Sequence, residues 1–397
     1  MAFSRSLSSS NSLPLLAIFL LTLLFYLNFV SRVIMAPLLP VVESELGLGH
    51  GQAGSLFFYM AFGYGVGLLG SGVVSHFLTH RLTVTFAGLL GGLSLVLISR
   101  SSSIGAIHTG LFFIGFFAGL YLPSGIATLT ELASRQNWGK AMAIHELAPN
   151  MAFITAPLLA EFLLRFFSWR DSLSVLGGWM IGMPFFFLLF GKGSRKRGEA
   201  PRFQLFREVL INRSCWVMVL FFMIAIGASM GAYAVMPLFL VSELGLERPW
   251  ANTLIGLSRS FGIILLFVSG VLIDRIGPIR ALTAFMTATG LFTLLLGAVP
   301  GAVPVSLLVF LQAASVACLF PTGFTLVSLI FPERLRGTAV SLVIFMGFLF
   351  GGGILPSALG HWAEVFSFSS GFALFGIATL VLLPFFRRPI SRLDLSG

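Results

Sequence analysis

Charged side chains are scarce in this sequence. Asp, Glu, Lys and Arg make up only 10% of its 397 residues, and apolar residues make up 57%, whereas soluble domains are about a quarter charged. So few charges cannot cover the surface of a water-soluble protein of this length. Apolar stretches long enough to cross about 30 Å of hydrocarbon as helices recur along the whole chain. The sequence therefore predicts an all-α membrane protein surrounded by a lipid bilayer.

Cysteines and enzyme motifs are also few or missing. Cys215 and Cys318 are the only cysteines, and both lie in apolar stretches without the paired spacing of a metal site or disulfide framework. No phosphate-binding glycine loop or serine-hydrolase elbow occurs. The run that begins His145-Glu146 starts like a zinc-protease motif, but Pro149 occupies the place of the second histidine. We therefore expect no enzyme or ATP-driven pump, no catalytic residue, no metal and no cofactor.

The net charge of +10 comes from basic residues in short loops. A nucleic-acid partner would need these residues on one folded face together with polar or aromatic readers, so none is expected. If both termini are cytoplasmic, 18 of the 24 Lys and Arg residues lie inside the cell, and four lie outside: Arg100, Arg165, Arg170 and Arg248. This asymmetry follows the positive-inside rule. It predicts a multi-pass protein of the cell (cytoplasmic or inner) membrane with both termini in the cytoplasm.

Hydropathy predicts twelve transmembrane helices. The expected spans are 13–40, 53–74, 82–99, 104–130, 141–164, 172–190, 215–241, 252–273, 281–299, 305–330, 338–359 and 371–388. Residues 1–190 are expected to form a first six-helix bundle and residues 215–397 a second. Residues 191–214 are interpreted as a basic cytoplasmic linker, with these charges: Lys192, Arg195, Lys196, Arg197, Arg202, Arg207 and Arg213.

The two predicted halves repeat each other. At an offset of 198 residues, Glu-Leu-Gly-Leu at 45–48 recurs at 243–246, Pro-Ser-Gly at 123–125 matches Pro-Thr-Gly at 321–323, and Gly-Lys-Ala at 139–141 matches Gly-Thr-Ala at 337–339. Pro37 and Pro237 pair at an offset of 200. Parallel repeats of six spans are typical of secondary transporters that rock around a central site.

A loop after the eighth span carries the most specific motif. Residues 270–280 read Gly-Val-Leu-Ile-Asp-Arg-Ile-Gly-Pro-Ile-Arg, which resembles the loop signature of the major facilitator superfamily (MFS). With twelve spans and the repeat, the resemblance covers nearly the whole chain and implies two pseudo-symmetric six-helix bundles that transport a solute. It assigns Asp274, Arg275, Gly277 and Arg280 to a gating loop. Asp274 can cap the fifth span near Gly139; the alternative is that these are solvated charges that follow the positive-inside rule. The first-half equivalent of this loop lacks the acidic residue.

Two arginines inside predicted spans carry the sharpest functional signal. A charge at the centre of a membrane helix costs about 2.5–3.5 kcal/mol, and the repeat places Arg32 near Ala232 and Arg259 on Ala61, so the scaffold itself needs neither charge. The resemblance implies that the first and eighth spans line a central cavity, where both guanidinium groups can bind one anion. Asn28, one turn before Arg32, shares its face. The alternative is that both side chains reach up to the outer headgroups.

His145 and Glu146 lie in the fifth span opposite Val343 and Ile344 of the repeat. Their side chains point about 100° apart on a helix, so at most one is expected to face the cavity. Either can carry a coupling proton, and Glu146 is preferred because Asn150 shares its stripe. A structural hydrogen bond is the alternative.

Polar residues on the fourth, seventh and tenth spans are candidates for lining the cavity: Tyr121, Tyr233 and Gln312. The sequence thus favours a secondary transporter for a small organic or inorganic anion, working by alternating access and coupled to protons by symport. A proton-driven exporter of drugs or metabolites with the same fold is the alternative. A receptor-like protein that no longer transports is a third interpretation.

Overall fold

The computed structural model describes residues 14–191, 196–198 and 203–391. Within these ranges the chain is almost wholly helical, and its one β-bridge joins Thr79 to Arg197. Twelve helical stretches are long and apolar enough to cross a membrane: Leu15–Leu46, His50–Phe77, His80–Ser99, Ile104–Leu132, Arg135–Leu164, Trp169–Phe190, Arg213–Glu243, Arg248–Ile276, Pro278–Ala298, Ala302–Ile330, Glu333–Val365 and Phe368–Phe386. The predicted all-α fold with twelve spans is confirmed.

Several spans consist of more than one helical element. The first six spans contain α1 (Leu15–Val33), α2 (Met35–Leu46), α3 (His50–Phe77), α4 (His80–Ser99), α5 (Ile104–Leu132), the 3-10 turn η1 (Arg135–Asn137), α6 (Trp138–Leu164) and α7 (Trp169–Phe190). The short helix α8 (Phe203–Ile211) follows. The last six spans contain α9 (Arg213–Ile226), η2 (Gly227–Gly231), α10 (Ala232–Leu238), η3 (Phe239–Glu243), α11 (Arg248–Ile276), α12 (Pro278–Ala298), α13 (Ala302–Ala317), α14 (Leu319–Ile330), α15 (Glu333–Gly347), η4 (Phe348–Ile354), α16 (Leu355–Val365) and α17 (Phe368–Ser391).

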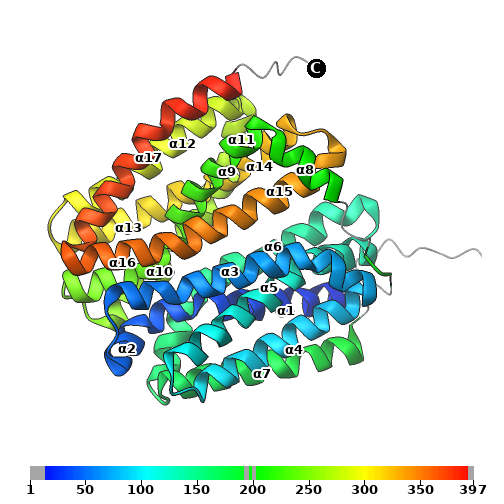
Figure 1. The fold of residues 1–397 in the computed structure, drawn as a ribbon, viewed down its shortest axis with the longest axis horizontal. Coiled ribbons are helices and arrows are strands. Elements are labelled where there is room, and N and C mark those ends of the chain that lie inside the picture. The colour runs from blue at the N-terminus through cyan, green and yellow to red at the C-terminus, as the bar shows by residue number, and fades with distance from the viewer. Residues whose placement is uncertain (1–13, 192–195, 199–202, 392–397) are drawn as a thin grey trace, which may run out of the picture.

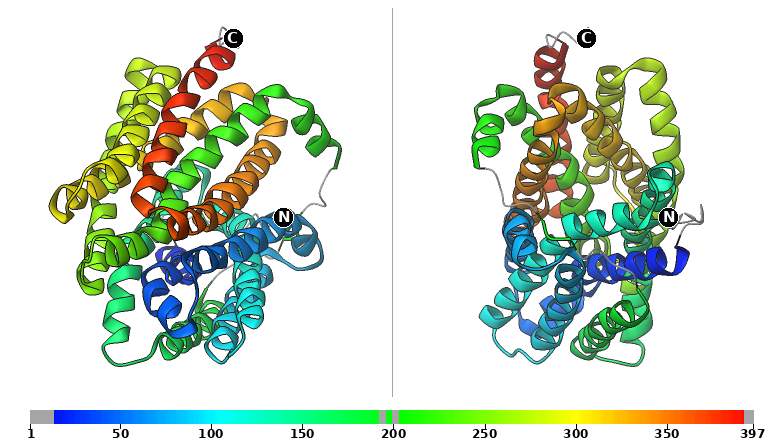
Figure 2. Two further views of the ribbon diagram at one scale, coloured as in Figure 1. Left: turned by 60° about the vertical axis from the view of Figure 1, so that its left-hand side comes forward. Right: turned by 90° about the vertical axis from the view of Figure 1, so that its right-hand side faces the viewer.

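The helices form two bundles that lie side by side (Figures 1 and 2). In the first, α3 packs on α5, α4 on α7, and α1 on α6; in the second, α12 packs on α17, α11 on α13, and α15 on α9. The bundles meet where α16 and η4 pack on α3, α11 on α6, and α10 on α2. A substrate site between the halves must therefore be built from these helices.

The repeat in the sequence produces matching geometry in the two bundles. Gly47 and Gly245 end the first span of each half with left-handed φ angles of 62° and 66°, a conformation that glycine adopts without strain. Just before them, the Glu45 carboxylate accepts hydrogen bonds from the Trp169 and Arg170 side chains at the start of α7. Glu243 accepts the backbone N–H groups of Phe368 and Ser369 at the start of α17. Each half thus ties its first span to its sixth.

Prolines divide two of the spans. Pro37 has no N–H to donate to the carbonyl of Val33, and α1 ends at Val33; Pro321 likewise leaves Ala317 unpaired, and α13 ends there. The seventh and eleventh spans are interrupted by the π-helical turns η2, η3 and η4, which leave backbone carbonyls free for other partners. Irregular backbone at membrane depth is tolerated only where protein or a cavity surrounds it.

The helix ends define two faces of the molecule. The linker side carries α8, the end of α7 and the start of α9, and the far side carries the loops at 47–49, 165–168 and 244–247. On the linker side, His80 N–H donates to the Lys196 carbonyl and Gly198 N–H to the Ser75 carbonyl, so this part of the linker pairs with the loop between α3 and α4. The predicted linker charges at 192, 195 and 202 lie outside the described residues.

Close contact between α3 and α5 depends on glycine. A Cβ atom at Gly115 would lie 1.9 Å from the carbonyl oxygen of Met60, and one at Gly63 would lie 2.0 Å from that of Phe112. Such small residues allow membrane helices to pack backbone against backbone. The α3–α5 pair is therefore fixed by sterics as well as by its apolar side chains.

We expect the Gly115→Ala variant to lose about 1–3 kcal/mol of stability, because the added methyl group must push α3 away from α5. The measurement is thermal unfolding of the purified protein in detergent. Gly105→Ala on the same helix is the control, since a Cβ atom there meets nothing within 4 Å. Equal unfolding temperatures for the two variants would contradict the packing argument.

Candidate substrate site between the halves

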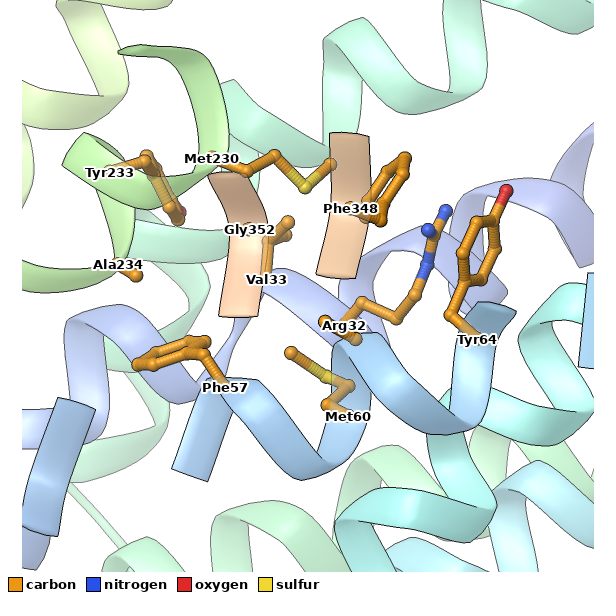
Figure 3. A pocket seen from close by; sticks show the side chains of 11 residues that line it. Arg32, Val33, Phe57, Met60, Tyr64, Met230, Tyr233, Ala234, Phe348 and Gly352 are labelled. Carbon is orange, nitrogen blue, oxygen red and sulfur yellow. The ribbon is translucent and has the colours of Figure 1, made fainter. Parts of the chain in front are cut away.

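A small cavity of about 30 Å³ lies between the two bundles. Figure 3 shows its lining, which comes from both halves: Arg32, Val33, Phe57, Met60, Ala61 and Tyr64 from the first, and Met230, Tyr233, Ala234, Phe348 and Gly352 from the second. Apolar side chains make up most of this surface. The ionisable groups on it are one arginine and two tyrosines, so any polar ligand must find its partners among them and the backbone.

Arg32, near the end of α1, places its guanidinium between aromatic rings. The side chain is 5% exposed, and its Cζ lies 4.3 Å from the centroid of the Phe29 ring, 4.6 Å from that of Tyr64 and 5.8 Å from that of Phe348. Figure 3 shows the guanidinium beside Tyr64 and Phe348. Its Nε and Nη1 atoms are buried without a hydrogen-bond partner among the described residues. The guanidinium also interacts with the Tyr64 side chain, but two of its nitrogen donors remain unused.

Asn28 lies one turn before Arg32 on the same helix. It is 1% exposed, and neither its Oδ1 nor its Nδ2 has a partner within the described ranges. A buried amide without partners costs about 1–3 kcal/mol. Asn28 and Arg32 therefore form a run of unsatisfied polar atoms on the face of α1.

Arg259 of α11 lies beside the cavity. Its Nη2 donates to the Ser229 carbonyl in η2 at 3.0 Å, a carbonyl that also accepts the Ala232 N–H. Its Cζ lies 4.8 Å from the Phe153 ring and 5.2 Å from the Tyr233 ring. Tyr233 does line the cavity, and its buried hydroxyl has no partner in the described chain. The Tyr233 ring thus lies between Arg259 and the cavity.

The two arginines do not share one cavity in this conformation. The Phe29 and Phe153 rings, 5.2 Å apart, connect them, because Arg32 covers Phe29 and Arg259 covers Phe153. A ligand that bridges both guanidinium groups would require this aromatic pair to move. Sequence spacing could not reveal these rings between the two charges.

Tyr121 and Gln312 point elsewhere. The Tyr121 hydroxyl donates to the Leu21 carbonyl at 2.8 Å within the first bundle, and the Gln312 amide donates to the Ala228 carbonyl of η2 at 2.8 Å. Both side chains are buried at or below 2% exposure, and neither lines the cavity. In this conformation they satisfy backbone carbonyls instead of facing a ligand.

His145 and Glu146 diverge as helix geometry predicts. His145 is fully buried against Phe25 and Tyr121, whereas the Glu146 side chain is 52% exposed. The Glu146 carboxylate interacts electrostatically with the hydroxyls of Tyr64 and Tyr121. Neither residue lines the cavity, but Glu146 is within electrostatic range of Tyr64, which does.

The predicted gating loop lies on the linker side at the end of α11. Asp274, Arg275 and Arg280 are exposed, and Gly277 adopts φ 82° between α11 and α12. The expected capping of the fifth span is absent in this conformation, since α6 has no side-chain cap. Any contact between Asp274 and α6 therefore belongs to a different arrangement of the halves.

A polar clasp that the sequence did not reveal joins the halves on the far side. The Glu161 carboxylate of α6 accepts Nε of Arg248 at 2.9 Å and Nη2 at 3.2 Å, and Nδ2 of Asn252 at 2.6 Å. Asn252 also donates to the Pro37 carbonyl of α2 at 3.1 Å. Nearby, Glu364 of α16 accepts the Gly51 N–H of α3 at 3.0 Å. In the sequence, the sign of this clasp was an acidic residue, Glu161, near the end of an apolar helix. Its partner Arg248 is 87 positions further along the chain, so the pairing could not be predicted.

Several proteins with similar sequences have names that refer to the transport or extrusion of an anion. The chain is 24% identical over 280 residues to a nitrite extrusion protein of Bacillus subtilis, covering 70% of this chain and 68% of that protein. It is 20% identical over 276 residues to a probable nitrate transporter NarT of Staphylococcus haemolyticus, covering 66% and 67%. A probable hexose phosphate transport protein of Chlamydia pneumoniae is 26% identical over 145 residues, which span 36% of this chain and only about a third of that protein.

Solved structures show the same fold. A bacterial homologue of the human lysosomal transporter Spinster, in an inward-facing and occupied conformation, superposes with a TM-score of 0.81 at 15% identity, covering 96% of this chain and 98% of that one. A D-xylose-proton symporter gives 0.76 at 15% identity, covering 95% and 98%. The sequence profile of the Major Facilitator Superfamily matches residues 18–310 and 261–395. Fold, repeat and profile agree, and the chain belongs to the Major Facilitator Superfamily of transporters.

Proposed function

We propose that this transporter carries a small oxyanion, which binds to Arg32 in the cavity between the halves, and that protons drive its movement by symport. The observation that carries this proposal is the guanidinium of Arg32, buried at 5% exposure with Nε and Nη1 unpaired. Its substrate enters and leaves by alternating access of the two halves.

The energetics of Arg32 call for a negative partner. No carboxylate among the described residues forms an ion pair with Arg32. Cation–π contacts recover about 0.5–2 kcal/mol each, but rings offer no lone pairs to the N–H groups, and each unsatisfied buried donor costs about 1–3 kcal/mol. A carboxylate-like or nitrate-like oxyanion can accept two of these N–H groups at once. Binding therefore satisfies groups that the protein alone leaves unpaired.

Cavity size favours an anion of few atoms. A volume of about 30 Å³ holds roughly two to three water-sized atoms by the usual measure of 10–15 Å³ each. The names of two relatives, a nitrite extrusion protein and a probable nitrate transporter, support the same size class. Phe57, Met60 and Met230 line the cavity as adaptable apolar walls, which is the feature that would suit a drug or metabolite exporter instead.

The clasp and the gating loop suggest how the halves alternate. Glu161, Arg248 and Asn252 join the halves on the far side, while Asp274 on the linker side is exposed. This pattern supports a conformation closed on the far side and released on the linker side, which positive-inside charge places in the cytoplasm. We propose that Asp274 and Arg275 make their latching contacts when the far side opens.

The substrate class is tested by thermal unfolding of the purified protein with nitrate, nitrite, phosphate or formate at constant ionic strength, with chloride as reference. An ion present at 100 times its dissociation constant stabilises the folded state by about 2.7 kcal/mol, and we expect at least one oxyanion to do so. Uptake of the same ion into proteoliposomes should follow an inward proton gradient. Stabilisation by neutral or cationic amphiphiles and by none of the anions would instead support the exporter.

Arg32→Met should make the protein without substrate more stable, by about 1–4 kcal/mol, because an apolar side chain of similar length replaces a charge that lacks a counter-ion. The same variant should lose the stabilisation by the oxyanion. Arg100→Met, which removes an exposed arginine, is the control and should retain it. A lower unfolding temperature for Arg32→Met without substrate would show that Arg32 stabilises the fold and is not an unpaired binding group.

Glu161→Gln should weaken closure of the far side, since the neutral amide loses charge-assisted hydrogen bonds worth about 1.5–3 kcal/mol each. A cysteine at the buried position Leu38, on α2 near Pro37, would then react about tenfold faster with a water-soluble thiol reagent. Glu247→Gln, an exposed carboxylate on the same side, should leave the rate unchanged. Equal labelling in both variants would remove the clasp from the transport cycle.

A further inference from the structure

The imidazole of His145 is fixed in position on both of its edges. Its ring has no exposed surface and stacks on Phe25 at 4.4 Å with an interplanar angle of 10°. Nε2 lies 3.1 Å from the Tyr121 hydroxyl, and Nδ1 lies 3.8 Å from Oε1 of Glu146. The stacking leaves the ring no freedom to turn either nitrogen toward another group.

The hydrogen bonds around Tyr121 determine which nitrogen of His145 carries the proton. The Tyr121 hydroxyl donates its single proton to the Leu21 carbonyl at 2.8 Å, because a carbonyl can only accept. The hydroxyl oxygen must then accept from His145, so Nε2 is the protonated nitrogen of the neutral ring. Nδ1 is left with a lone pair, and it is buried without a hydrogen-bond partner in the described chain.

That lone pair faces the Glu146 carboxylate. When Glu146 is ionised and His145 is neutral, two acceptors oppose each other across 3.8 Å with no proton between them. One added proton, whichever of the two atoms holds it, gives the pair one donor and one acceptor, and a shift of the Glu146 carboxylate by about 1 Å then brings them to hydrogen-bond distance. The Glu146 side chain is half exposed and His145 has no exposed surface, so the proton must enter and leave the pair through Glu146.

We propose that His145 Nδ1 and the Glu146 carboxylate together form the proton-binding site of this transporter, holding one proton between them, with Tyr121 setting the tautomer of His145. This inference rests on the proposed proton coupling, and it replaces a choice between two neighbouring residues with a single shared site. Nothing but a proton is transferred: water delivers it to Glu146 and removes it again.

The groups around this pair connect it to the anion site. Tyr121 of α5 and Tyr64 of α3 interact electrostatically with Glu146, and Tyr64 interacts in turn with Arg32 of α1. Arg259 of α11 faces α6 one ring away, over Phe153. An oxyanion bound to Arg32 adds negative charge near His145 and Glu146, and it therefore favours the protonated form of this pair. By linkage, protonation must raise the affinity for the anion equally.

The tautomer can be tested without any substrate, by nitrogen NMR of protein labelled with ¹⁵N-histidine, with the His145 signal assigned by its loss in His145→Gln. Above its titration, His145 should show a protonated Nε2 and a bare Nδ1. A protonated Nδ1 under those conditions would overturn the proposal, and this result is independent of which ion the protein transports.

The shared site is tested by calorimetry with the oxyanion found in the unfolding screen, in buffers of different ionisation enthalpy. At a pH where the pair is unprotonated without the anion and protonated with it, binding should take up about one proton per anion, and affinity should fall as the pH rises. Three variants should abolish this uptake to the same extent: Glu146→Gln, His145→Gln and the double variant. Each of them removes the same single proton site. Glu333→Gln, an exposed carboxylate on the linker side, should keep it.

Each result has a distinct meaning. Uptake lost in Glu146→Gln but kept in His145→Gln would assign the proton to Glu146 alone and overturn the shared site. Anion binding without proton uptake in the natural protein would overturn the pair while leaving anion transport standing, and the absence of any anion binding would overturn the proposed function itself. If His145→Gln does not fold, Tyr121→Phe serves: it removes the acceptor of Nε2–H, so half-maximal uptake should shift to lower pH, and an unchanged midpoint would contradict the proposal.

Discussion

A positive charge buried without a counter-ion is the constraint around which the centre of this protein is organised. Arg32 lies at the interface of the two halves, where Phe29, Tyr64 and Phe348 cover its guanidinium. Aromatic faces reduce the cost of desolvating the charge but do not satisfy its N–H groups. The folded protein is therefore less stable than it would be if these N–H groups had hydrogen-bond acceptors. Under the proposed function, a bound anion would supply the missing acceptors, which would favour it over neutral solutes of similar size.

The helices of the two halves follow the sequence repeat, but the charged residues inside the spans do not. Glu45 and Glu243 fasten the first span of each half to the sixth, and Gly47 and Gly245 end those spans in the same conformation. Arg259, in contrast, corresponds in the repeat to Ala61, which lines the cavity as a small apolar residue. His145 and Glu146 likewise correspond to Val343 and Ile344. Duplicated positions hold the fold together, and the residues proposed to act in transport are departures from the duplication.

Closure and binding depend on the same few interfaces. The clasp of Glu161 with Arg248 and Asn252 holds α6 against α11 on the far side, and α6 also carries His145 and Glu146. Helix α11 carries Arg259, whose side chain donates a hydrogen bond to the Ser229 carbonyl of η2. A movement of α6 against α11 therefore changes the clasp, the surroundings of His145 and Glu146 and the position of Arg259 together. The proposed coupling would need no long pathway, because one helix pair carries all three.

Local composition was enough to determine the membrane class, the twelve spans, the two halves and the identity of the unusual charges. Each of these depends on residues within a single helix or on the repeat, and hydropathy, proline and glycine act over a few positions. The contacts that give those charges a role join residues far apart in the chain. Tyr121 meets His145 over 24 positions, Arg248 meets Glu161 over 87, and Gly51 meets Glu364 over 313. Three contacts were decided only by the packing of the helices. Tyr121 and Gln312 donate hydrogen bonds to backbone carbonyls, Phe29 and Phe153 lie between the two arginines, and Glu161 joins the halves. Helix periodicity fixes the direction of a side chain but not the residue that it contacts.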